Sequence, residues 1–592
     1  MSEHLIPPQP GDVPRPVASD GRPPVHPALS ESGRLLCAGT YLDAPYRDRV
    51  IDELFVHEER IAAPSYGFDA TRVLAHALRA RRIEIAWAAA ILGAWFIGSL
   101  LTGGTLAALL VPFLLFSLSR WLRRRESGPA RFLGVVVLIA TWVMLLLVVI
   151  GLWAYLAAAS WDLVEFGRLL SGDDGRYGGY GSDSVYGGSA YGDGDGGAGT
   201  GALLWLLPAA FAGIVALVGL QRGHAARVIA TQLSPDRYAD RARDPAEASQ
   251  GARFARVGAR ILGEQYAPLV MYNIGDPFCG AGEPFRPWQL SVELRRREGP
   301  DAGREPYPVT NAHIVERIVP LLHALRVPSP HGSPQAREAV LDRLRELVVD
   351  ECVFLPAVGL PHRDSAPLGP EHFAAHRLGA IEEGGERRRH FLRVRVGGWD
   401  ENLVVTVFVR VHTQGRMLML EVAPHVLLPV RARFRDADAD AHRLLHNNWF
   451  GTAASALAAT PGSFLTAVTT LARGAASWWR IATGGHGGAR PQGPRASVRE
   501  LGSSDEGSLF HLMDLDRYLK TVQDRVVGGV TVALHEAGWH TDEFARRAVH
   551  VAEGGVFIQS VNGSAFSVGG TGHDNTVRGG GTGSGKGSSG GK

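Results

Sequence analysis

The chain has 592 residues and carries 61 Lys and Arg against 59 Asp and Glu, so its net charge at pH 7 is +2. A chain this close to neutral has no broad basic face, which argues against nucleic-acid binding as its primary role. Its three cysteines, Cys37, Cys279 and Cys352, are scattered singly. This spacing provides neither a disulfide framework nor a Cys-x-x-Cys metal motif.

The first 82 residues divide into two parts. Residues 1–30 are rich in proline and poor in large apolar side chains. They predict a disordered arm, because too little surface can be buried to offset the entropy of ordering. Residues 31–82 predict a small cytoplasmic helical section, in which Asp43 and Asp69 can cap helices. We interpret this section as the place where the cytoplasmic domain docks.

Residues 83–221 form the region around which the rest of the chain is organised. It contains three uncharged apolar blocks at 85–118, 132–159 and 202–220. A membrane-spanning helix needs roughly 20 apolar residues, so the first block is too long for one crossing. A turn at 102–104 would divide it into two short crossings, which predicts an α-helical membrane region of four transmembrane helices. The alternative is a single bent or re-entrant element at 85–118.

The placement of basic residues predicts the orientation of this region. Arginines cluster at 79–82, 120–131 and 222–227, whereas the segment 160–201 has seven acidic and two basic residues. Short loops rich in Lys and Arg stay on the cytoplasmic side. We therefore expect a multi-pass protein of the plasma membrane with both termini in the cytoplasm. The external segment 160–201, rich in Gly, Tyr and Asp, favours a solvated linker; adhesion to cell-wall polymer or to another protein is the alternative.

Residues 222–430 predict a cytoplasmic α+β domain. Expected strands lie at 269–274, 288–294, 391–396, 403–411 and 417–422, and expected helices at 225–261, 310–325 and 336–348. The last three strands are joined by short turns, which indicates an antiparallel sheet rather than a parallel βαβ arrangement.

Residues 431–483 are unusual because no charged residue occurs from 444 to 472. Pro461 breaks this run, so we expect a pair of helices that lie on the membrane surface or pack on the domain, rather than a fifth crossing. The membrane-interface residues would be Trp449, Trp478, Trp479 and Arg480, because Trp and Arg favour that layer.

The remaining residues predict a linker at 484–497, a helical pair and a short hairpin at 498–577, and a disordered Gly/Ser tail at 578–592. Two apparent motifs there are decoys. The glycine-rich segment 580–587 lacks the Ser or Thr that follows the lysine of a phosphate-binding loop. His535 and His540 are five residues apart instead of four, and Gly538 would end the helix between them.

Two groups of residues are candidate sites. The breaker-rich loop 276–283 predicts a binding cleft with Cys279 as a candidate nucleophile, although no partner histidine is identifiable by spacing and a structural turn is favoured. His372 and His376 have helical spacing and His362 is nearby, but no pattern of further metal ligands follows. We therefore predict no catalytic residue and no cofactor. The residues of the cleft would be Asp276, Phe278, Cys279, Glu283 and Trp288.

Several stretches resemble a known group of proteins. Residues 34–47 and 63–67 resemble the amino-terminal part of large uncharacterised membrane proteins of filamentous high-GC bacteria, and residues 277–288 and 516–544 are similar to their later parts. That group has no established activity. The resemblance implies the architecture and no catalytic residue.

These patterns favour an integral membrane protein with a large cytoplasmic binding or scaffold domain, in an envelope or defence assembly. Its expected partners are the lipid bilayer and either another protein or a second copy of the chain. A transporter is disfavoured because the second and third apolar blocks contain no ionisable residue. The alternatives are a membrane-anchored enzyme that uses the 276–283 cleft, and an oligomeric channel.

Overall fold

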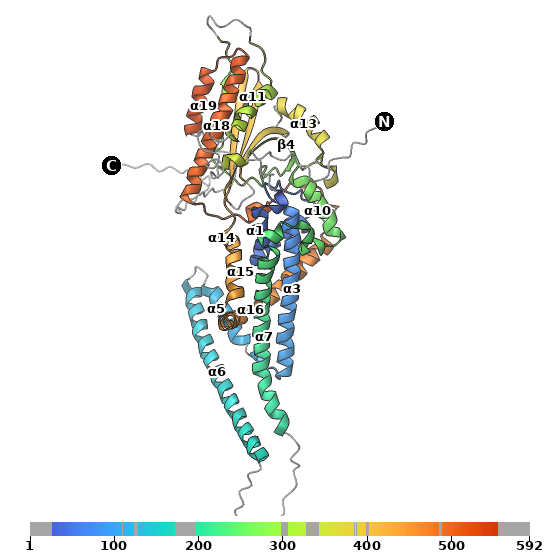
Figure 1. Ribbon diagram of the computed structural model, residues 1–592, viewed down its shortest axis with the longest axis vertical. Helices are drawn as coiled ribbons and strands as arrows, with labels where there is room; N and C mark the ends of the chain where they lie inside the picture. The colour runs from blue at the N-terminus through green and yellow to red at the C-terminus, as the bar shows by residue number, and fades with distance from the viewer. Residues whose placement is uncertain are drawn as a thin grey trace, which may run out of the picture.

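The computed structural model describes residues 26–108, 110–123, 128–171, 197–297, 306–326, 343–383, 385, 387–397, 402–484 and 488–554. Residues 1–25 of the predicted arm, most of the predicted external loop, the hairpin at 556–568 and the tail lie outside these residues. The end of the predicted arm is ordered instead, because Pro27–Leu29 form a 3-10 helix in which Ala28 is buried. Figure 1 shows a sheet domain at one end of the molecule and the long helices α3, α6 and α7 at the other.

Within the described part of the chain, three helices are long and apolar enough to cross a membrane. They are α3 (Ala70–Leu101), α6 (Gly128–Ser171) and α7 (Gly197–Gln232), and the qualifying segments are Ala70–Leu101, Gly128–Leu147 and Leu206–Gln232. This length and composition indicate membrane association.

The predicted turn at 102–104 is present, but the prediction of four spanning helices is not confirmed. Helix α3 ends at Leu101, and Gly103 and Gly104 both have positive φ. The chain continues as the shorter helices α4 (Thr105–Ala108) and α5 (Leu110–Arg123). The described helices after the turn are therefore too short to count as a fourth span by length alone.

The apolar parts of α3 and α7 share a cluster with α16 (Trp449–Thr483). The expected pair of helices at 431–483 is wrong in this respect, because α16 is a single helix of 35 residues with Pro461 inside it. Hydroxyl groups on both sides of the proline bond to the helix backbone: Thr460 donates to the carbonyl of Ala456, and Ser463 to that of Thr460, each at 2.8 Å. Such bonds help a helix to tolerate proline. The cluster consists of Ala88, Ile91, Trp95, Leu106, Ile214, Val218 and Ala467.

Between the long helices and the sheet lies a layer that we call the collar. It consists of α1 (Glu31–Leu42), α2 (Ala44–Ile51), α10 (Ala252–Gln265), α14 (Ala432–Arg435) and α15 (Ala437–His446), together with the short elements between α2 and α3 and between α7 and α10. These elements share one apolar core with the first turns of α3 and the last turns of α7. Both predicted caps are present: Asp43 accepts a hydrogen bond from the amide of Tyr46, and Asp69 from that of Thr71. Helices α1 and α14 approach closely, since a Cβ on Gly39 would lie 2.5 Å from the Phe434 ring.

The sheet has seven strands. Its order is β1-β4-β5-β6-β7-β2, and β3 also pairs with β7. The predicted antiparallel run is confirmed for β5 to β7. Strand β4, which was not predicted, pairs antiparallel with β5, and β1 lies parallel to β4, so the sheet is mixed and not purely antiparallel. The strands are β1 (Leu269–Tyr272), β2 (Glu283–Pro284), β3 (Trp288–Glu293), β4 (Leu347–Pro356), β5 (Arg389–Val396), β6 (Val404–Gln414) and β7 (Met417–Leu427).

The helix predicted at 336–348 is wrong at its carboxyl end. A 3-10 turn, η5 (Arg343–Glu346), leads directly into β4, and Leu347 pairs with Val396 of β5. The segment from 347 to 356 is rich in β-branched residues, which fit a pleated surface. Its pairing with β5 outweighs the helical spacing of the leucines before it. Residues 336–342 lie outside the described part of the chain.

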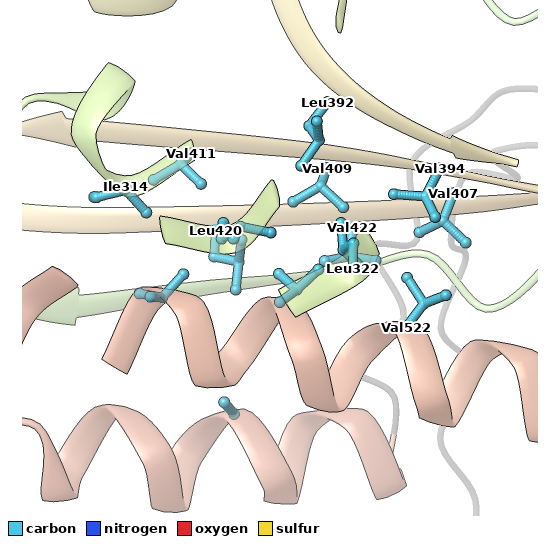
Figure 2. Packing of buried hydrophobic residues seen from close by; sticks show 14 of the residues in the cluster. Ile314, Leu322, Leu392, Val394, Val407, Val409, Val411, Leu420, Val422 and Val522 are labelled. Atoms are coloured by element: carbon cyan, nitrogen blue, oxygen red, sulfur yellow. The ribbon is translucent and has the colours of Figure 1, made fainter. Parts of the chain in front are cut away.

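The two faces of the sheet are covered differently. One face packs against α11 (Asn311–His323), α18 (Leu509–Glu536) and α19 (Asp542–Gly554). Val409 and Leu420 of the sheet and Val522 of α18 all belong to this core (Figure 2). The other face carries an aromatic cluster that we describe below. Helix α13 (Pro370–Glu382) contacts β4, β5 and β6. The remaining short elements are η1 (Pro27–Leu29), η2 (Asp52–Val56), α8 (Pro235–Tyr238), η3 (Arg241–Arg243), α9 (Pro245–Ala248), η4 (Ala324–Arg326), η6 (Arg363–Ser365) and α17 (Val498–Leu501).

A buried ion pair joins the collar to the sheet domain. Arg363, at the start of η6, donates from Nε and Nη2 to the two carboxylate oxygens of Glu264 on α10, at 2.7 and 2.6 Å. Glu264 also accepts the amide of Ala62 at 2.8 Å, and Arg363 donates to the carbonyl of Glu58 at 2.7 Å. A paired, hydrogen-bonded contact of this kind fixes the relative position of the segments that it links.

We predict that Arg363→Ala destabilises the protein by about 3–5 kcal/mol, because it leaves the Glu264 carboxylate buried without its cation. Thermal unfolding of the purified chain in detergent would measure the change. Arg260→Ala is the matched control, since Arg260 pairs at 2.8 Å with the exposed carboxylate of Asp364 beside the same turn. The control should change stability by less than about 1 kcal/mol. Equal effects of the two substitutions would contradict the prediction.

Candidate functional site

The loop between β1 and β2, residues 273–282, contains most of the candidate cleft, and we call it the glycine loop. It requires glycine at two positions, because Gly280 and Gly282 have φ values of +103° and +90°. A Cβ on Gly280 would lie 2.8 Å from the carbonyl oxygen of Pro64, and one on Gly282 would lie 2.2 Å from that of Val426. The loop is therefore pressed against both the segment before α3 and strand β7.

The glycine loop is held by Glu500 of α17. The Glu500 carboxylate accepts hydrogen bonds from the amides of Gly280 and Gly282 at 2.7 and 3.0 Å, and from the amide of Ser497 at 3.1 Å. The Cys279 thiol donates to the same carboxylate at 3.7 Å. Burial raises the pKa of Glu500, although the amide hydrogen bonds oppose this shift. One side chain thus satisfies three backbone donors and closes the loop.

Cys279 lies in a site that keeps its thiol protonated. Burial raises the pKa of Cys279 well above its ordinary value, and the carboxylates of Glu500 and Asp276 raise it further. Burial also raises the pKa of Asp276. A nucleophilic cysteine needs the thiolate and is usually found near a cation or a helix N-terminus. The surroundings of Cys279 have the opposite effect.

The structure does not bring the five predicted cleft residues together. Phe278 packs into the aromatic cluster, with its ring 4.5 Å from that of His425 and 4.7 Å from that of Phe408. Trp288 belongs to the helix-covered core on the other face of the sheet. Glu283 is exposed on β2, where it pairs with Val426. The rest of the aromatic cluster is formed by Tyr66, Phe354 and Phe391, with Tyr272 at its edge.

The three predicted histidines lie on the surface of the sheet domain. His372 and His376 are one turn apart on α13, and His362 is exposed just before η6. Burial lowers the pKa of His376, and the charges of Arg388 and His372 lower it further. Among the described residues, no group of three or more His, Cys, Asp or Glu side chains is placed to hold a metal ion.

The predicted membrane-interface residues lie at the two ends of α16. Trp449 begins the helix and is 81% exposed, and Trp478 and Trp479 project outward near its end. Arg480 donates to Asp52 of η2 at 3.1 Å, which ties this end of the helix to the collar.

Sequence reasoning missed two polar clusters. In the collar, Arg72 donates through Nε and Nη2 to Asp244 at 3.0 and 2.9 Å, and His76 Nε2 lies 3.1 Å from the same oxygen. Burial opposes ionisation of Asp244, but the hydrogen bond to His76 and the charge of Arg72 lower its pKa overall. In the sheet domain, the second cluster is formed by Glu351, His390 and Arg377. No local pattern could have revealed the first cluster, because Asp244 lies some 170 residues from Arg72 and His76 in the sequence.

Glu351 links β4 to β5 and α13. Its carboxylate lies 2.7 Å from His390 Nε2 and accepts Arg377 Nη2 at 3.0 Å. Burial opposes ionisation, but these two partners lower the pKa of Glu351 to about 2.

The comparisons with known proteins assign one part of the chain. Residues 287–566 match the AbeC-like domain family, so an AbeC-like domain is present over just under half of the chain. No curated protein and no solved structure matches. The matched range contains β3 to β7 together with α16 and α18. Strands β1 and β2 and the glycine loop precede it, although they belong to the same sheet.

We predict that Glu500→Ala frees the glycine loop, because it leaves the amides of Gly280 and Gly282 without their acceptor. Each unpaired amide costs about 1–3 kcal/mol. The rate at which a maleimide labels Cys279 should increase, and the midpoint of thermal unfolding should fall. Asp505→Ala, at an exposed position five residues away, is the control. An unchanged labelling rate in Glu500→Ala would argue against this role of Glu500.

We predict a pH-dependent contribution from Glu351. Its folded pKa is below the ordinary value of 4.5, so its stabilisation is present above pH 4.5 and is lost as the pH falls toward 2. The difference in stability between the wild type and Glu351→Gln should be about 3 kcal/mol at pH 7 and smaller by about 2 kcal/mol at pH 3. Thermal unfolding at both pH values measures it. Glu371→Gln, on the exposed start of α13, should show no such difference.

Proposed function

We propose that this chain is an integral membrane protein that holds a binding or scaffold domain at the cytoplasmic face of the plasma membrane. The single observation that carries the proposal is the continuity of α3 and α7. Each runs unbroken from the apolar cluster into the core of the collar. Because helices are stiff over such lengths, the sheet domain is held at a fixed distance from the bilayer.

The charge pattern supports the cytoplasmic orientation. Arg79, Arg81 and Arg82 lie on the collar side of α3, and Arg222 and Arg227 lie on the collar side of α7. Basic residues near the ends of spanning helices stay in the cytoplasm. The collar and the sheet domain are then cytoplasmic, and the helix ends near residues 102 and 197 face outward.

An exposed apolar patch at the start of α18 supports the binding role. Leu509, Phe510 and Met513 are all exposed, and Phe510 is 75% exposed. They lie next to the collar end of the sheet, since Val430 of the collar core pairs with Ser503 just before α18. Large apolar side chains gathered on a surface mark protein contacts. The partner would be another protein or a second copy, in an envelope or defence assembly.

The enzyme alternative has less support from the geometry. It needs a reactive thiol in an accessible cleft, whereas Cys279 is buried and its pKa is raised. The channel alternative predicts ion flux in liposomes, and a flux above that of empty liposomes would favour it over the scaffold.

We predict that a cysteine introduced at Leu378, which is 70% exposed on α13, faces the cytoplasm. The three native cysteines are buried, so they contribute little background. A membrane-impermeant maleimide should label Leu378→Cys in inverted vesicles but not in intact cells. Labelling in intact cells would place the sheet domain outside and overturn the orientation.

We predict that a benzophenone amino acid at Phe510 crosslinks to a partner in native membranes, because the patch lies at a contact. Gel electrophoresis should show an adduct larger than the monomer, and mass spectrometry should identify either a second protein or a second copy. The same photoreactive residue at Leu378 is the control and should give no such adduct. Failure to form an adduct at Phe510 would remove the patch as a contact site.

A further inference from the structure

Helix α16 has its polarity inverted relative to a helix of a water-soluble protein. The side chains that it buries are small or hydroxylated, whereas several of those that it exposes are large and apolar. Soluble helices bury their large apolar side chains and expose polar ones. Helices in lipid pack through small residues and turn their large apolar side chains outward. The buried set is Ala456, Thr460, Ser463, Ala467, Thr470 and Ser477, and the exposed set is Trp449, Phe450, Leu457, Val468, Trp478 and Trp479.

The exposed hydroxyl groups in the middle of α16 are satisfied within the helix. Thr466 donates to the carbonyl of Gly462 at 2.9 Å, and Thr469 donates to that of Thr466 at 2.9 Å. A hydroxyl that faces water has no need of such a bond, whereas one that faces hydrocarbon must find a partner in the protein. These two threonines are therefore compatible with a lipid environment.

The carboxyl end of α16 is at the collar, and its middle is among the apolar helices. Leu445, just before α16, and Ile481, near its end, pack against the collar core. Between them, Ala467 belongs to the cluster of α3 and α7, and the Phe464 ring lies 6.2 Å from that of Trp95. The chain thus leaves the collar at the end of α15, reaches the apolar cluster along α16 and returns to the collar near Ile481.

The contacts between α16 and α3 indicate how deep α16 reaches into the apolar region. Trp95 lies ten residues into the apolar block that starts at Ile85. At 1.5 Å per residue this is about 15 Å, or half of a hydrocarbon layer about 30 Å thick. Near the collar the contacts become polar: Arg81 donates to the carbonyl of Arg473 at 3.1 Å, and Arg222 to that of Ser455 at 2.9 Å.

We propose that α16 is a re-entrant helix whose outer face contacts the acyl chains of the bilayer. The inference rests on the proposed function, since it takes α3 and α7 to cross the membrane. Because α16 lies within residues 287–566, the AbeC-like domain then inserts a helix of its own into lipid. The absence of charge from 444 to 472 and the tryptophans at both ends match a segment that enters and leaves through the interfacial layer.

The test uses nitroxide labels on the full chain in lipid nanodiscs. Leu457→Cys and Val468→Cys place labels on one face of α16, since eleven residues are close to three helical turns. Ile97→Cys, on the exposed face of α3, is the lipid reference, and Leu378→Cys on α13 is the water reference. All four positions are exposed, and the buried native cysteines leave the introduced thiol as the reactive one. Thermal unfolding confirms that each variant is folded.

Power saturation with oxygen and with a water-soluble nickel chelate distinguishes the environments, because oxygen concentrates in hydrocarbon. Positions 457 and 468 should resemble position 97, with oxygen accessibility several-fold above nickel accessibility, and position 378 should show the reverse. Nickel access at 457 and 468 with lipid character at 97 would overturn the inference and leave the proposed function standing. Low access of both reagents at 457 and 468 would mean that protein covers α16, which also overturns it. Nickel access at position 97 would overturn the proposed function itself.

Discussion

Helix α3 is continuous, yet one end packs in the apolar cluster and the other in the collar core. The rest of the structure depends on this constraint. Its last turns pack through Ile91 and Trp95 against α7 and α16, whereas its first turns bury Val73 and Leu74 in the collar. Polar side chains can be buried only where they are paired. Arg72 and His76 are therefore found on the collar side, where both contact Asp244. The collar supplies these partners and so fixes where the apolar part of α3 begins.

Paired polar side chains also connect the segments of the sheet domain. Two carboxylates, the buried Glu264 and the half-buried Glu500, connect segments that are distant in sequence, and each accepts several hydrogen bonds. A single buried carboxylate can join segments in this way because it has two oxygens with about four acceptor positions. The domain is therefore joined to its support through a few directional contacts as well as through apolar packing. The directional contacts and the apolar packing are both consistent with the proposed scaffold role, because a scaffold needs a domain that is held in a fixed orientation.

The sequence predicted the features that depend on local patterns. The turn at 102–104, the caps Asp43 and Asp69, and the antiparallel run of β5 to β7 all follow from short-range spacing. The sequence did not predict elements whose structure depends on a partner that is distant in the chain. The strand that begins at Leu347 is set by β5, and β1 lies parallel to β4 although they are distant in the chain. For the candidate site, spacing identified Gly280 and Gly282 as breakers. It could reveal Glu500 only as part of a Ser-x-x-Glu cap, because the loop that it holds lies some 220 residues away.

The range that matches the family model does not include every strand of the sheet. The matched range starts at residue 287, yet β1 pairs with β4 and β2 with β7, and both precede that boundary. A fragment cut at the boundary would expose the backbone of β4 from Val353 to Pro356 and would leave Glu500 without two of its donors. Open strand edges of this kind invite pairing between molecules. The range that matches the family model and the range that completes the sheet are thus different in this chain, so a fragment meant to contain the whole sheet has to begin before β1 at Leu269.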